Sequence, residues 1–172
     1  QTISVNDASR SFYNMVVNNG STLTIIAPAT NITVSNSFNL SNGSFVIGAN
    51  TLTLNGSVSS MSASNNITGS ASSNLVIGGS GSLGTLFFNT GTPGTSNQLN
   101  NCTINRTSVV IDLGNDVNIR TALTLTNGVI STSTSKVIMN STGTVSRTNG
   151  YINGNLQKNV ATGATSRTFE IG

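Results

Sequence analysis

Residues 123–128 read Leu-Thr-Leu-Thr-Asn-Gly, and residues 38–43 read Phe-Asn-Leu-Ser-Asn-Gly. Both phrases alternate apolar and polar side chains, which places alternate residues on opposite faces of a β-strand. Each phrase ends in Asn-Gly, a pair that tolerates the positive φ angles of tight turns. The two phrases therefore predict short strands that bury one face and end at a turn.

The two phrases lie 85 residues apart, and other segments match at nearly the same offset. The matches pair residues 31–34 with 116–119, 52–55 with 137–140, 67–69 with 152–154 and, at an offset of 87, 12–18 with 99–105. Such self-similarity is typical of repeat proteins. We therefore divide the chain into a lead-in strand or end of a preceding repeat (1–11), a first unit (12–98) and an incomplete second unit (99–172).

The strand signals recur too closely along the chain for crossover helices to join the strands. No stretch has the apolar spacing of an amphipathic helix, so we expect almost no helix. The remaining solutions are all-β. We favour a right-handed parallel β-helix (β-solenoid) built from the two units of about 85 residues, and the alternative is a tandem β-sandwich. At about 20 residues per rung the solenoid would have eight or nine rungs, with Leu, Ile, Val, Phe and Met inside and ladders of Asn at the strand ends.

Composition limits the classes of function. Ser, Thr and Asn make up 77 of the 172 residues, only 6% are charged, and the chain has one Cys and no His. These counts exclude a Ser-His-Asp triad, a zinc site built on imidazole and an internal disulfide framework. The seven basic residues are dispersed, which argues against a nucleic-acid groove. No window approaches the ~18 apolar residues of a membrane span, so we expect no membrane insertion. Weak charge without disulfides fits a secreted, cell-surface protein.

Several segments resemble a known family. Residues 12–20 (Phe-Tyr-Asn-Met-Val-Val-Asn-Asn-Gly), 123–128 and 154–158 (Gly-Asn-Leu-Gln-Lys) are similar to the repeats of large adhesin-like surface proteins of Bacteroidota, which the type IX system secretes. The closing Thr168-Phe169-Glu170-Ile171-Gly172 is similar to the phrase that ends a repeat block in that family. The resemblance implies an extracellular β-helical repeat and defines no active site.

Three features invite a chemical reading, and each has a simpler explanation. Residues 79–84 (Gly-Ser-Gly-Ser-Leu-Gly) fit the dinucleotide pattern G-x-G-x-x-G, but a strand-like segment follows where the pattern needs a helix, so we predict a turn. Asp112 and Asp116 could share a turn, and we expect a structural role rather than calcium binding or polysaccharide-lyase chemistry. Cys102 matches Met15 in the repeat register and is predicted to be a core residue. We predict no catalytic, cofactor or metal site.

Pairs of threonines provide the one candidate for a binding surface. In Thr22-x-Thr24, Thr51-x-Thr53 and Thr124-x-Thr126 the neighbouring Leu or Ile residues should point inward, so the Thr side chains should point outward. Thr also favours exposed strand positions for its β-propensity alone. We therefore expect a non-catalytic structural or adhesive repeat of an extracellular fibre or adhesin stalk, with neighbouring repeats or fibre copies as partners. The alternative is a module that binds ice or polysaccharide through these Thr residues.

Overall fold

The fold consists of strands alone in the part of the chain that the structure describes. The computed structural model describes residues 2–3, 9–25, 31–163, 166 and 168–172, and these contain no helix. The strands are β1 (Thr2–Ile3), β2 (Ser9–Ile25), β3 (Asn31–Val46), β4 (Thr51–Leu54), β5 (Ser57–Ser59), β6 (Ile67–Thr68), β7 (Asn74–Ile77), β8 (Thr85–Leu86), β9 (Gln98–Leu113), β10 (Val117–Ser131), β11 (Val137–Met139), β12 (Thr144–Arg147), β13 (Tyr151–Asn153) and β14 (Leu156–Lys158).

Every pairing between these strands is parallel. Each coil of the chain lies on the preceding one, so that Ile32 is beside Leu52, Leu52 beside Leu75, and Leu75 beside Cys102. The predicted β-solenoid is therefore confirmed, and the tandem β-sandwich is not the fold. The prediction of eight or nine rungs was too high, since there are about six turns. The register shows why, because these three steps span 20, 23 and 27 residues.

Each coil has three straight segments, which we name from strand β3. Face A contains Asn31–Val34, face B contains Ser37–Leu40, and face C begins at Ser44. Register shifts in the pairing of β2 with β3 fall between these segments, where the chain turns a corner. In the next coil the same segments are separate strands, with β4 on face A, β5 on face B and β6 on face C.

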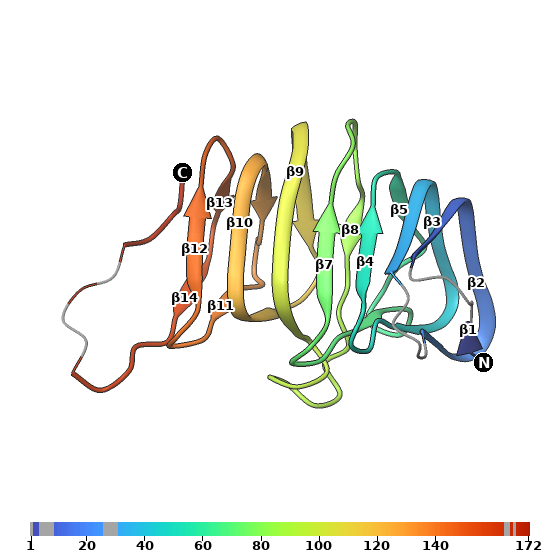
Figure 1. The fold of residues 1–172 in the computed structure, drawn as a ribbon, viewed down its shortest axis with the longest axis horizontal. Coiled ribbons are helices and arrows are strands. Elements are labelled where there is room, and N and C mark those ends of the chain that lie inside the picture. Colours follow the sequence, from blue (N-terminus) through green and yellow to red (C-terminus); the bar gives the residue numbers. More distant parts are fainter. Residues whose placement is uncertain (1, 4–8, 26–30, 164–165, 167) are drawn as a thin grey trace.

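Face A continues through seven rungs without a register shift. It is formed by β4, β7, β12 and the corresponding segments of β2, β3, β9 and β10. Figure 1 shows these strands side by side along the long axis of the molecule. Face A is thus a continuous parallel sheet.

The 85-residue sequence offset does not equal a whole number of coils. Four coils along face A carry the chain from Ile32 to Leu123, which is 91 residues. The offset is therefore one segment short of four coils. It relates Ile32 on face A to Val117, which lies one segment before Leu123 of face A. Similar phrases on different faces produce the sequence match. The boundaries at 12–98 and 99–172 stay a prediction, and of the lead-in 1–11 the structure describes residues 2–3 and 9–11.

Inward side chains of all three faces form one core. As predicted, it is built from Leu, Ile, Val, Phe and Met, and Cys102 is part of it. Phe38 and Phe45 are both fully buried, and their rings meet edge to face with centroids 5.3 Å apart. Alternation along each strand leaves the polar neighbours outside, which explains how a chain with so few apolar residues fills a core.

Asparagine side chains complete the backbone hydrogen bonding at the corners. The amide of Asn115 donates to the Phe88 carbonyl oxygen, and its own oxygen accepts from the Phe88 N–H. Asn97 binds the Asp116 carbonyl oxygen and the Gly94 N–H in the same way. Buried polar groups of a turning backbone need such partners. On the surface, the predicted Asn ladder is confirmed between Asn105 and Asn127, whose side chains lie 2.9 Å apart.

Candidate functional site

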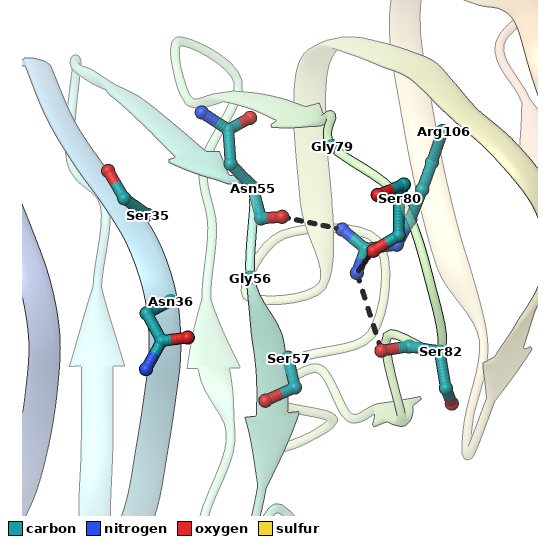
Figure 2. Close-up of a pocket in the computed structure, with 9 residues that line it drawn as sticks. All are labelled: Ser35, Asn36, Asn55, Gly56, Ser57, Gly79, Ser80, Ser82 and Arg106. Carbon is teal, nitrogen blue, oxygen red and sulfur yellow. Dashed lines mark hydrogen bonds between the residues drawn. The ribbon is translucent and has the colours of Figure 1, made fainter.

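A polar groove of about 620 Å³ lies at the corner between faces A and B (Figure 2). Its wall is backbone at Gly56 and Gly79, because a Cβ at either position would lie about 2 Å from the carbonyl oxygen of the preceding coil. The remaining lining consists of hydroxyl and amide side chains and one guanidinium, from Ser35, Asn36, Asn55, Ser57, Ser80, Ser82 and Arg106.

The side chain of Arg106 fills this corner from the inside and is 1% exposed. Its Nε donates to the Gly81 carbonyl oxygen, at 2.7 Å. Nη1 donates to the carbonyl oxygens of Asn55 and Gly78, and Nη2 to those of Ser80 and Ser82. All five N–H groups of the guanidinium therefore donate to backbone oxygens. Figure 2 draws the hydrogen bonds that the carbonyl oxygens of Asn55 and Ser82 accept.

The arrangement identifies the role of the glycine-rich segment 79–84. Its carbonyl oxygens converge on a cation, whereas a phosphate-binding loop presents its N–H groups to an anion. The prediction of a turn between strands is thus confirmed, with the addition that Arg106 orders it. Burial lowers the pKa of the Arg106 guanidinium below its ordinary value, and the carbonyl dipoles offset the cost of the buried charge. We assign Arg106 to holding the corner together.

The predicted Thr residues do not all lie on one surface. Thr51, Thr53 and Thr124 are on face A. Thr22 and Thr24 pair with Ser44 and Val46 on face C. Thr126 lies in the corner after face A, where the pairing of β10 with β9 shifts register. The structure therefore brings together half of the predicted set.

Sequence reasoning missed two residues that complete the surface. Thr33 pairs with Thr53, and Thr103 pairs with Thr124. Neither has a Thr two positions away, so a search for Thr-x-Thr pairs does not find them. Aligning the sequence by coils of 20 to 27 residues, rather than by the 85-residue repeat, places these two pairs in one column.

The two central acids differ in position, since Asp116 lies between strands β9 and β10 whereas Asp112 lies within β9. The Asp116 carboxylate accepts the backbone N–H of Lys136, at 2.8 Å, just as the Asn31 side chain accepts the N–H of Thr51. Asp112 is exposed on face B and pairs with Thr85 and Ser131, so the turn role predicted for it is wrong. The residues that the structure describes contain no cluster of three or more His, Cys, Asp or Glu side chains suited to a metal ion. A turn role for Asp116 follows from its hydrogen bond.

Cys102 is a core residue whose acid–base behaviour is changed by burial. It lies between Leu75 and Leu123 in the face A ladder, not on the segment of Met15, and it is buried. Burial raises the pKa of its thiol to about 12. The thiol form therefore persists in the folded protein, and the thiolate that would act as a nucleophile does not form near neutral pH.

We expect the thiol of Cys102 to resist alkylation in the folded chain. At pH 8 its reaction with a disulfide reagent should be at least about a thousandfold slower than in urea, because reaction requires local opening. The unfolded thiol has a pKa of about 8.5, so the contribution of this buried thiol to the free energy of unfolding should be fully present below that pH. Between about pH 9 and 12 the unfolded chain loses the thiol proton and the folded chain keeps it, so the free energy of unfolding should fall by about 1.4 kcal/mol per pH unit. Absorbance kinetics and urea titrations at several pH values measure both effects. Rapid native labelling would show that the site is open.

Comparison with known proteins gives no relative. No protein-family model matches the chain, and no curated protein or solved structure matches it significantly. Across the described residues there is also no helix long and apolar enough to cross a membrane. The groove and face A are therefore the two features from which a function can be inferred.

Proposed function

We propose that this chain is a non-catalytic structural and adhesive repeat of an extracellular surface fibre or adhesin stalk. The observation that supports this proposal is the unbroken face A ladder, in which seven rungs are joined by parallel backbone pairing. In a solenoid each coil contacts its neighbours alone, so added coils extend the molecule by about 4.8 Å each without changing its width. Such a unit is suited to holding a binding surface away from a cell.

The surface chemistry supports the same role. Only 6% of the residues are charged, so stacked rungs place few like charges beside one another. Outward positions carry mainly Ser, Thr and Asn, which hydrate well without ionic attraction to nucleic acid. In this proposal the protein is secreted to the cell surface, as in the adhesin-like proteins of Bacteroidota that its repeats resemble. Its partners are neighbouring repeats or fibre copies, and glycans of other surfaces.

A tandem fusion of two copies of the chain tests the structural role. We expect its maximum dimension in small-angle X-ray scattering to be nearly twice that of one copy, with an unchanged cross-sectional radius, because coils add along one axis. The single copy is the control. A tandem that scatters as a compact particle, or as two flexibly linked ones, contradicts the stalk. Cleavage of uronic-acid polymers by the chain would contradict its non-catalytic nature.

A further inference from the structure

Two columns of outward side chains run along face A. They alternate with buried residues such as Ile32 and Val34, and no member of either column is buried. The threonine column consists of Ser11, Thr33, Thr53, Val76, Thr103, Thr124 and Ser146. The asparagine column consists of Ser9, Asn31, Thr51, Asn74, Asn101, Ala122 and Thr144.

These columns form a rigid two-dimensional lattice. Neighbouring rungs of a sheet are about 4.8 Å apart, and residues two positions apart on a strand are separated by about 6.6 Å. Thr has a restricted χ1 angle, so successive Thr side chains can repeat one orientation of hydroxyl and methyl group. Val76 has the same branched shape as Thr, so its side chain projects as far from the sheet as those of Thr53 and Thr103 beside it. In the second column, the Asn101 amide donates to the Asn74 side-chain oxygen, at 2.9 Å.

Irregularity of the coils is confined to other parts of the molecule. The step from Leu75 to Cys102 is seven residues longer than the step from Ile32 to Leu52, yet both join face A segments in uninterrupted register. The additional residues lie in turns such as 89–97, which contribute nothing to face A. Face A therefore keeps its spacing through seven rungs while the turns of the coil vary in length.

The chemistry of this lattice selects a neutral partner. Neither column contains a charged or aromatic side chain. Arg10 and Arg147 occur at inward positions of the first and last rungs, and Arg120 lies at the corner that precedes Ala122, so the two columns themselves carry no charge. Hydroxyl, amide and methyl groups at fixed intervals match a flat solid that presents hydrogen-bond donors and acceptors at regular intervals. Ice and crystalline polysaccharide are two such solids.

We infer that face A binds the surface of ice through the threonine and asparagine columns. Ordered water accepts and donates hydrogen bonds in a lattice whose oxygen spacings are close to those of the two columns, and methyl groups fit between its oxygens. Polysaccharide is the weaker match, because protein sites grip the apolar faces of sugar rings with aromatic side chains, which these columns lack. Ice binding by face A does not depend on the stalk role proposed above.

Binding of this kind depends on preorganisation and number. A single Thr hydroxyl gains little on exchanging liquid water for ordered water. Fourteen side chains held on one rigid sheet lose little further freedom on binding, so their small contributions accumulate. Disturbing the centre of the lattice should therefore remove most of the activity.

Ice-recrystallisation inhibition and partition into slowly growing ice test this inference. We expect the wild-type chain to be enriched in the ice fraction and to inhibit recrystallisation. The double variant Thr53→Lys/Thr103→Lys should need at least a tenfold higher concentration for the same inhibition, because two bulky cations would project from the lattice. Ser59→Lys, on exposed face B of the same coil as Thr53, is the matched control and should behave as wild type.

Exclusion of the wild-type chain from ice would overturn the inference, as would full activity of the double variant. A parallel pull-down on crystalline cellulose and chitin separates the other candidate, since retention there with exclusion from ice would assign face A to polysaccharide. Urea unfolding of each variant establishes that it is folded. If the lysine variant does not fold, Thr53→Ala/Thr103→Ala removes the same hydroxyl and methyl groups at lower risk, and its full activity would equally refute ice binding.

Discussion

Replacing Arg106 with methionine should lower the free energy of unfolding by at least about 3 kcal/mol. Methionine fills part of the same volume but leaves five backbone carbonyl oxygens without their donors. Each buried polar group that loses its partner costs about 1–3 kcal/mol, and water from the adjoining groove can satisfy only some of them. Arg106→Lys should recover part of the loss, because an ammonium has three donors and cannot span the same five oxygens.

Urea titration followed by far-UV circular dichroism measures this effect. Arg120→Met is the matched control, since Arg120 is exposed and donates a single long hydrogen bond to the Ala71 carbonyl oxygen, at 3.4 Å. Its free energy of unfolding should differ from wild type by no more than a surface substitution allows, about 0.5 kcal/mol. Equal midpoints for Arg106→Met and wild type would show that the corner holds without the guanidinium.

Truncation of Phe38 to alanine should destabilise the chain by about 3–5 kcal/mol, the usual range for a buried Phe. The ring is fully buried, and it meets Phe45 at an interplanar angle of 77°. Both the lost burial and the cavity left between neighbouring coils contribute. Because coils stack on one another, the cavity also weakens the contacts of Met15 and Val58, the neighbours of Phe38 in the coils on either side.

Tyr13→Ala is the matched control for this variant. Tyr13 is in the coil next to Phe38, and it is 71% exposed, so removing its ring should change stability by less than about 0.5 kcal/mol. Thermal and urea unfolding of the two variants give the comparison directly. A loss for Phe38→Ala as small as that for Tyr13→Ala would mean that the coils repack around the missing ring.

The class of fold could be predicted from the sequence because period-two alternation is a local signal. Leu123 and Leu125, with Thr124 between them, show which side of a strand is buried without knowledge of its partner. The coil length was not accessible in this way. It depends on turns as different as 55–56 and 89–97, and parallel pairing between residues 20 or more apart leaves no short-range pattern.

The candidate surfaces show the same limit. Thr51, Thr53 and Thr124 could be predicted to be exposed, since a strand pattern settles which side chains face outward. Which of them share a face depends on the register between coils, so Thr22 was wrongly grouped with them and Thr33 was missed. Arg106 could not be found at all, because one Arg within a strand gives no sign that a loop 25 residues earlier closes around it.

The guanidinium of Arg106 has a further consequence for how the molecule bears load. A stack of coils under tension would come apart from its ends, one layer after another, because each layer is fastened only to the next. The Arg106 guanidinium donates hydrogen bonds to Gly78 in the adjacent coil and to Asn55 two coils away, so it links three consecutive coils. We therefore expect unfolding under force to slow where it reaches this point, because the hydrogen bonds of three coils must break there together.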